Sequence, residues 1–193
     1  KPAYVPLGTT ANKQGRIAAD HICGRRSAYT GALGTSVLKL FDLTAASTGL
    51  NEKQARAAGV AYDKVVTYSA SHASYYPGAR NMTVKTLFDP ASGRILGAQI
   101  VGFDGVDKRM DVLAAAIRAG LTAEQLTELD LAYAPPYGSA KDPVNMAGYV
   151  IENVRAGLVE QHHWDAVAEL PADGSVILLD VRTPGEVRKQ GLL

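Results

Sequence analysis

Apolar and β-branched residues concentrate in short runs along the middle of the chain, and these runs predict strands at 36–42, 63–69 and 81–88. One face of the third run is formed by Met82, Val84, Thr86 and Phe88. The turn sequence DPASG follows, and the chain returns at 94–102, where Leu96, Ala98 and Ile100 share a face. The last two runs therefore predict an antiparallel hairpin.

A second pattern, with small and apolar residues three or four positions apart, predicts a helix near the N-terminus. We place it between Ala11 and Gly24, with Thr10 as the N-cap and Gly24 as the stop. The face that repeats is formed by Ala11, Gly15, Ala18 and Ile22. Because small residues permit close approach, we expect another element to pack on this face.

The same helical spacing recurs between and after the strands. Asn51 caps a short helix that Gly59 ends, a longer amphipathic helix ends at Gly120, and Thr122 caps another helix. The apolar positions of the longer helix are Val106, Met110, Leu113 and Ile117. After the proline-rich loop AYAPPYG, a strict four-three alternation predicts a seam that packs on one partner surface. This seam is formed by Val144, Ala147, Ile151, Val154 and Leu158.

The order of these elements predicts an α+β fold over residues 34–157, with the helices on one side of a mostly antiparallel sheet. The rest of the chain differs. Trp164 opens a short helical stretch, and 176–181 (VILLDV) is a continuous apolar run typical of a strand buried on both faces in a parallel sheet. Burying such a strand takes a domain of about a hundred residues. The sequence therefore has the character of a fragment cut at both ends.

Composition narrows the possible partners and locations. The 193 residues include 20 Lys and Arg against 19 Asp and Glu, a net charge of +1, so the molecule lacks the field that would hold nucleic acid or an anionic membrane. No uncharged apolar stretch approaches the length of a membrane span, and no signal-peptide core is visible. We therefore expect a cytoplasmic protein that binds neither nucleic acid nor membrane.

Local charge and the cysteine count add two details. Residues 1–27 carry five basic side chains and only one acid, Asp20, so an anion could bind here. Cys23 is the single cysteine, which excludes an intramolecular disulfide, a CxxC pair and a cysteine-rich zinc site. It lies late in the first helix, and we expect it to be a spectator. His162 and His163 are adjacent, not one helical turn apart, so we expect no metal site.

Three motifs resemble a known family. The segments PLGTTANKQGRIAADHICG, TSVLKLFDLTAASTGL and AYAPPYGSAKDPVNMAGYVIENV are similar to the C-terminal part of the pyridine nucleotide-disulfide oxidoreductases. They are most similar to the branch of coenzyme A-disulfide reductase and its NADH oxidase, peroxidase and polysulfide reductase relatives. The tail ILLDVRTPGE resembles the first strand of a rhodanese domain, a domain that is fused to some reductases of this branch.

The resemblance implies a division of the chain into three parts. Residues 1–33 would end the FAD-binding domain, 34–157 would form the dimerisation domain of a homodimer, and 158–193 would be a linker with the truncated start of a rhodanese-like α/β domain. The Gly-rich turns that bind FAD and NAD(P)H, and the redox cysteine, would precede Lys1, and the rhodanese nucleophile would follow Leu193. FAD and NAD(P)H are then cofactors of the parent enzyme, and we expect this fragment to retain neither and to be inactive alone.

Two tyrosines are the catalytic candidates. Tyr133 lies in a loop that Pro135 and Pro136 stiffen, and a phenol held beside a thiolate or flavin can donate a hydrogen bond to developing charge. In the family, the tyrosine of this motif reaches the flavin and redox cysteine of the other subunit. Tyr75, in SHASYYPG, aligns with a second such tyrosine, although the adjacent Tyr76 leaves that alignment one residue uncertain.

The remaining candidates would bind substrate or cofactor. Lys141 matches a substrate-binding lysine of the motif and could pair with the phosphates of coenzyme A. Ala11, Asn12 and Lys13 open the basic helix, whose start faces the flavin in the family, and the position near Asn12 touches substrate. Some relatives carry histidine near that position, so the asparagine weakens the case for an acid-base role there.

Two other classes of function fit the sequence less well. An independent rhodanese-type sulfurtransferase is disfavoured because the only cysteine, Cys23, lies 157 residues before Asp180 of the DVR strand. A freestanding interaction module would not need so stiff a tyrosine loop. Within the family, the substrate could be coenzyme A disulfide, a persulfide, a polysulfide, oxygen or peroxide, and the reductant NADH or NADPH.

Overall fold

The structure is a computed structural model that describes residues 4–190. The chain divides into two compact units, of which the first ends at Val159 and the second begins at Glu160. The candidate catalytic residues all belong to the first unit, so that unit is described first.

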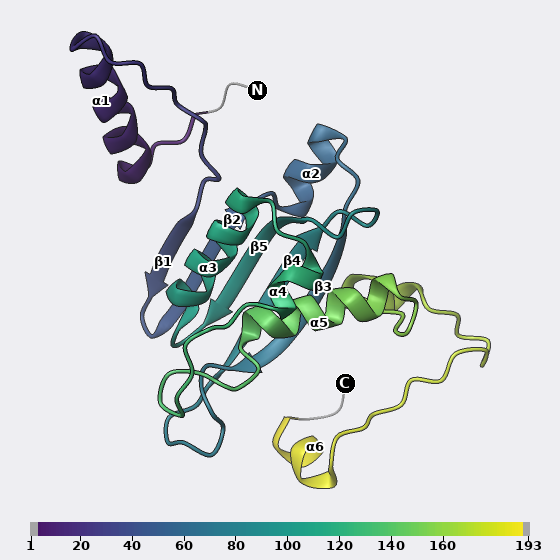
Figure 1. Ribbon diagram of the computed structural model, residues 1–193. Helices are drawn as coiled ribbons and strands as arrows, with labels where there is room; N and C mark the ends of the chain where they lie inside the picture. Colours follow the sequence, from purple (N-terminus) through teal and green to yellow (C-terminus); the bar gives the residue numbers. More distant parts are fainter. Residues whose placement is uncertain (1–3, 191–193) are drawn as a thin grey trace. The chain divides into compact units, whose positions relative to one another are not determined.

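A five-stranded, fully antiparallel sheet forms the centre of the first unit (Figure 1). Its strands are β1 (Ser36–Leu40), β2 (Leu43–Gly49), β3 (Asp63–Ala70), β4 (Asn81–Phe88) and β5 (Ile95–Gly102), in the spatial order β1-β2-β5-β4-β3. The predicted hairpin is confirmed as β4 and β5, with Asp89 accepting the amides of Ala91 and Ser92 in the turn between them. A register shift between Leu87 and Phe88 keeps both side chains buried.

Helices cover one face of this sheet, as the α+β prediction required (Figure 1). They are α3 (Val106–Ala119), α4 (Ala123–Thr127) and α5 (Pro143–Arg155), while α2 (Glu52–Ala58) lies between β2 and β3 in sequence. The predicted caps are confirmed: Asn51 and Thr122 form capping boxes, and Gly59 and Gly120 adopt the left-handed conformation at helix ends. The core between sheet and helices includes Val65, Val84, Phe88, Ile100, Met110, Leu113, Leu126, Val144 and Ile151.

The seam of α5 differs from the prediction in one respect. Val144, Ala147 and Ile151 are buried in the core of their own chain, so they present no apolar surface to a second molecule. Leu158 lies beyond the end of α5 and is 74 % exposed. The helix ends at Arg155 because Gly157, in the left-handed conformation, turns the chain away, and the seam cannot continue.

The single strand expected at 36–42 is wrong in its extent. It is a hairpin of β1 and β2 that pairs Leu40 with Leu43 across a two-residue turn of Phe41 and Asp42. Phe41 takes a positive φ of 52°, which favours glycine, and its side chain is 91 % exposed. All five residues of β1 are exposed, so this edge of the sheet has no cover within the described chain.

The opposite face of the sheet carries both an apolar row and an ion-pair cluster. Tyr68, Val101 and Leu38 lie in one row of cross-strand neighbours, and all three are exposed. Beside that row, Glu52 at the start of α2 pairs with Lys64 and Lys85. Burial opposes ionisation of Glu52, but hydrogen bonds from the two ammonium groups outweigh it and lower the pKa of Glu52 to about 2.

Helix α1 (Gly8–Ile22) begins earlier than predicted. Leu7 is the N-cap residue, and the amide of Ala11 already bonds to the Leu7 carbonyl, so Thr10 lies inside the helix and is not its cap. The helix ends as expected before Gly24. Its predicted packing face, from Ala11 to Ile22, is exposed in this chain.

The second unit contains a 3₁₀ helix at Trp164–Glu169, where a helical stretch was predicted, and α6 (Pro184–Gln190). The strand predicted at 176–181 is wrong: the segment has no strand pairing, and Ile177, Leu178, Leu179 and Val181 are exposed. A strand needs neighbours to satisfy its backbone groups. The described part of this unit provides none, so the apolar run stays unpaired.

Candidate functional site

Two loops lie side by side at one end of the sheet (Figure 1). Residues 71–80 connect β3 to β4, and residues 128–142 connect α4 to α5. The amide of Ala73 donates to the Pro135 carbonyl over 3.3 Å, which joins the loops directly. The first loop is buried at its base, over Ser71–Ala73, and exposed at its tip, so the sheet anchors it and solvent surrounds the end.

The tips of these loops bring the two candidate tyrosines together. The hydroxyl oxygens of Tyr75 and Tyr133 are 3.4 Å apart, although the residues are 58 positions apart in sequence. The hydrogen bond with Tyr133, together with partial burial, raises the pKa of the Tyr75 phenol. Tyr75 is 75 % exposed and Tyr133 is 49 % exposed, so the pair faces outward from a fixed base.

Buried polar residues form that base. His72 is 5 % exposed and its ring nitrogens lie within hydrogen-bond distance of Ser71 Oγ, at 3.2 Å, and the Pro77 carbonyl, at 3.3 Å. Its ring also packs edge-on against Tyr76, with the centroids 5.9 Å apart. At the other end of the loop, the guanidinium of Arg80 lies 3.5 Å from the centre of the Phe103 ring. These contacts fix the loop that carries Tyr75.

The second loop is held by an ion pair that the sequence reading missed. Arg109 of α3 and Asp142 are both almost fully buried, and Arg109 Nη2 lies 2.9 Å from Asp142 Oδ2. Asp142 also accepts the Val144 amide and so caps α5. A signal was present: Arg109 stands three residues after Val106 and four before Leu113, on the apolar face of its helix. A charge in that position needs a buried partner.

The structure places the other predicted residues apart from the tyrosine pair. Lys141 is exposed and directly precedes the buried Asp142. Ala11, Asn12 and Lys13 are exposed on α1, and the Asn12 amide donates to the Gly8 carbonyl of its own helix over 2.8 Å. Since α1 begins at Gly8, the amides free at its start belong to Gly8–Thr10, one turn before the residues that were expected to open it.

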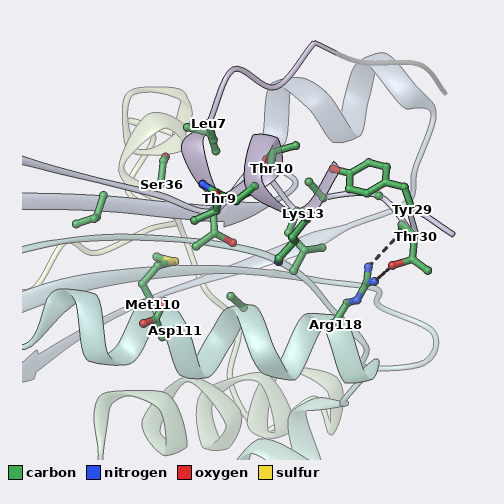
Figure 2. A pocket seen from close by; sticks show the side chains of 18 of the residues that line it. Leu7, Thr9, Thr10, Lys13, Tyr29, Thr30, Ser36, Met110, Asp111 and Arg118 are labelled. Carbon is green, nitrogen blue, oxygen red and sulfur yellow. Dashed lines mark hydrogen bonds between the residues drawn. The ribbon is translucent and has the colours of Figure 1, made fainter. Parts of the chain in front are cut away.

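A cavity of about 1100 Å³ lies between α1, residues 28–37 and α3 (Figure 2). Asn12 and Lys13 line it, with Asp107 and Asp111 on the α3 side. Arg118 closes one end by donating to the carbonyl and hydroxyl oxygens of Thr30. Tyr75, Tyr133 and Lys141 do not line this cavity.

Among residues 4–190, no three His, Cys, Asp or Glu side chains gather as ligands of a metal ion. Within that same part of the chain, none of the helices combines the length and the apolar character needed to cross a membrane.

An antiparallel sheet with helices on one face places this chain among the α+β proteins. The model of the family described as "Pyridine nucleotide-disulphide oxidoreductase, dimerisation domain" matches residues 35–143. This match covers more than half of the chain. The chain therefore belongs to the pyridine nucleotide-disulphide oxidoreductase family, as the motifs in the sequence indicated.

Individual relatives fall within the branch that the sequence resembles. Coenzyme A disulfide reductase of Staphylococcus haemolyticus is 42 % identical over 149 residues, which cover 77 % of this chain and 33 % of the relative. Its counterpart from Staphylococcus aureus is 40 % identical over the same length, covering 34 % of the relative. The chain thus spans about a third of the length of the curated relatives that it matches.

Solved structures of two reductases and one oxidase are also similar to this chain. The reduced CoADR-RHD of Bacillus anthracis superimposes with a TM-score of 0.91 at 48 % identity, covering 98 % of this chain and 34 % of that one. A NAD-dependent persulfide reductase from A. fulgidus gives 0.81 at 47 % identity, covering 83 % and 30 %. The water-forming NADH oxidase of Lactobacillus brevis gives 0.78 at 25 % identity, covering 83 % and 36 %.

Proposed function

We propose that this chain is the dimerisation and active-site-completing portion of an FAD-dependent NAD(P)H oxidoreductase that acts on coenzyme A disulfide, a persulfide or a polysulfide. The observation that carries the proposal is the pairing of Tyr75 with Tyr133 at the tips of two anchored loops. Both side chains are exposed, while Ser71–Ala73 at the start of the first loop and Asp142 at the end of the second are buried, an arrangement that presents phenols to a group outside this chain.

Each predicted site residue receives a role in this proposal. Tyr75 and Tyr133 donate a hydrogen bond to the sulfur charge that develops in the active site of the other subunit. The exposed ammonium of Lys141 pairs with a phosphate of coenzyme A. Asn12 contacts substrate through its side-chain oxygen or second amide hydrogen, since its bond to the Gly8 carbonyl uses only one hydrogen.

The residues at the start of α1 fit a flavin. This helix end carries no acidic residue in its first turn and no side-chain cap, and its positive dipole end and Lys13 suit the electron-rich edge of a reduced flavin. Ala11, Asn12 and Lys13 are the residues of this chain that would lie beside the FAD. When bound, FAD passes electrons from NAD(P)H to the substrate, and this chain by itself is expected to retain neither cofactor.

A homodimer follows from where apolar side chains remain exposed. The buried seam of α5 does not contribute. The β1–β2 hairpin does, through Leu38, Leu40 and Phe41, and so does the exposed row that contains Tyr68 and Val101. A surface of this kind is commonly covered by a symmetric copy of itself.

The alternative is a portion of an NADH oxidase or peroxidase that acts on oxygen or peroxide. The Lactobacillus brevis oxidase shares the fold at 25 % identity, whereas the two reductase structures reach 47 % and 48 %. These identities favour a sulfur substrate. We also propose that residues 158–193 are a linker and the start of a rhodanese-like domain, which is supported by the 98 % coverage that the Bacillus anthracis structure gives, including most of the second unit.

Subunit complementation tests the proposal in the complete enzyme. One subunit would carry Tyr75→Phe and Tyr133→Phe, and the other would lack the redox cysteine that we place before Lys1. Either homodimer should be nearly inactive with NADH or NADPH and coenzyme A disulfide. An equimolar mixture of re-associated subunits should regain about a quarter of the activity, since half of its dimers are hybrids with one intact site each.

Unmixed controls and a range of acceptors complete the experiment. Failure of the mixed dimers to exceed both homodimers would show that the tyrosines do not act across the interface. Rates with coenzyme A persulfide, polysulfide, oxygen and peroxide, measured on the unaltered enzyme, identify the substrate class. Turnover of oxygen or peroxide alone would favour the oxidase or peroxidase alternative.

A further inference from the structure

Arg109 is the largest side chain that is almost completely buried in the described chain, and it is charged. It is 1 % exposed, in contact with Asp142, which is 3 % exposed. Two of its nitrogens bond to the same carboxylate oxygen: Nε lies 3.1 Å and Nη2 lies 2.9 Å from Asp142 Oδ2. This two-point contact fixes the plane of the guanidinium and its direction.

The rest of the guanidinium reaches the backbone of both tyrosine loops. Nη2 donates to the Ser71 carbonyl over 2.9 Å and approaches the Tyr137 carbonyl at 3.4 Å. Ser71 lies four residues before Tyr75, and Tyr137 lies four residues after Tyr133. One planar group therefore holds the base of both loops whose tips carry the paired hydroxyls.

The start of α3 is shaped around this side chain. Nη1 donates to the Gly105 carbonyl over 3.2 Å. A Cβ at position 105 would lie 2.2 Å from Nη1, and Gly105 has a positive φ of 65°. Glycine is thus required here for two reasons, the backbone conformation and the space that Arg109 occupies.

This network is poorly explained as a source of stability. Removing two charges from water costs about as much free energy as their mutual attraction returns. Apolar residues of similar volume often stabilise a fold equally well. What apolar residues cannot supply is a planar fork with donors in fixed directions. We propose that Arg109 is a positioning residue that aligns Tyr75 with Tyr133 by bonding to both of their loops through Ser71, Tyr137 and Asp142. Its relevance to catalysis rests on the proposed function, in which these two tyrosines act on substrate.

The alignment is tested on the 193-residue chain without any cofactor. Tyrosine labelled with ¹³C at Cζ reports ionisation of each phenol by NMR, and Tyr75→Phe identifies the signal of Tyr75. Arg109→Lys keeps the charge but loses the fork, so the Tyr75 titration should move to lower pH, toward that of free tyrosine. Tyr133→Phe should shift it in the same direction, because both changes remove the Tyr75–Tyr133 bond.

Two further variants keep the result interpretable. Arg109→Met with Asp142→Ser removes the whole ion pair, fills similar space and leaves an acceptor for the Val144 amide, so it covers the case in which Arg109→Lys does not fold. Leu113→Ala, one turn along the same helix, is the matched control and should leave the Tyr75 titration in place. An unchanged Tyr75 titration in a folded Arg109 variant would overturn the proposal, as would an equal shift in Leu113→Ala.

Kinetics of the complete enzyme separate this proposal from the proposed function. Arg109→Lys should lower kcat about tenfold or more with KM little changed, and should add no further loss when Tyr75 and Tyr133 are already phenylalanine. If the double tyrosine variant keeps full turnover, the proposed function fails, while the NMR result still decides whether Arg109 aligns the pair. If Arg109→Lys lowers kcat equally with and without the tyrosines, Arg109 does not act through them.

Discussion

Tyr75 and Tyr133 place their hydroxyl oxygens 3.4 Å apart at the surface of the first unit. A hydrogen bond between two phenols uses one of the two hydroxyl protons, which leaves the other free to point outward. The pair therefore offers one directed donor that either ring could supply if the other were lost. This property shapes the first prediction.

Single and double removal of the hydroxyls should differ sharply. In the complete enzyme, Tyr75→Phe or Tyr133→Phe alone leaves one donor, so we expect kcat to fall by about tenfold or less. The double variant leaves none, and loss of a donor to developing charge costs about 100-fold or more. Steady-state kinetics and size-exclusion chromatography on all four proteins provide the measurement. A double variant with unchanged turnover, or one whose loss follows loss of dimer, would mean that the tyrosines only anchor their loops.

The oligomeric state of the chain itself is the second prediction. Sedimentation velocity at micromolar concentration should show a homodimer in place of a 20.4 kDa monomer. Leu38→Glu, in the exposed strand β1, should shift the equilibrium toward monomer by placing a charge on the apolar surface. Lys39→Glu, its neighbour on the other face of the same strand, is the matched control. A monomer in the unaltered chain would contradict the prediction.

Acid stability provides the third prediction. Glu52 has a pKa of about 2 in the folded chain against 4.5 for an unperturbed glutamate, so its stabilisation is fully present above about pH 4.5 and is lost as the pH falls toward 2. Its side chain is 14 % exposed, and we expect a contribution of about 2 kcal/mol at neutral pH. Glu52→Gln should remove this contribution at pH 7 and flatten the decline below pH 4.5. Urea titrations at pH 7 and pH 3 measure both effects, and parallel pH curves for the two proteins would refute the assignment.

Gly97 gives the fourth prediction. A Cβ at this position of β5 would lie 1.8 Å from the Leu50 carbonyl oxygen, where the Leu50 amide also bonds to Leu96. Gly97→Ala should therefore lower the free energy of unfolding by about 3 kcal/mol or more. Gly15→Ala is the control: the methyl group meets nothing within 4 Å, and alanine favours a helix interior by up to about 1 kcal/mol. Urea titration should rank the two variants on opposite sides of the unaltered chain.

The elements that could be predicted from the sequence have a recognisable spacing of apolar residues within the segment itself. Strand β4 alternates buried and less buried positions from Asn81 to Thr86, and β5 is an apolar run in which Gln99 is the single polar residue. Helix α3 repeats apolar residues at helical spacing between a left-handed Gly105 and a left-handed Gly120. Strand β2 has the sequence LTAASTG, which lacks such a pattern. The segment is extended because it pairs with β5, which lies far away in the sequence. The run 176–181 shows the reverse case, since its apolar pattern predicts a strand that no described neighbour completes.

Part of the candidate site could likewise be predicted from the sequence, and part could not. Tyr75, Tyr133 and Lys141 could be named because they belong to motifs that can be read along the chain. The contact between Arg109 and Asp142 could not, since it joins residues 33 positions apart, although the place of Arg109 on the apolar face of its helix indicates a buried partner. The start of α1 was misplaced by three residues because Leu7, an apolar residue without a capping side chain, takes the N-cap position.

The contacts of Arg109 and of the tyrosine pair join residues far apart in the sequence, so they should form late in folding. Arg109 reaches Asp142 across 33 residues and Ser71 across 38, and the tyrosines meet across 58. Closing loops of this length costs entropy that only an assembled core can offset. The tyrosine pair should therefore align only after β3, α3 and α5 have docked, so a nascent chain would hold most of its hairpins and helices before the two hydroxyls met.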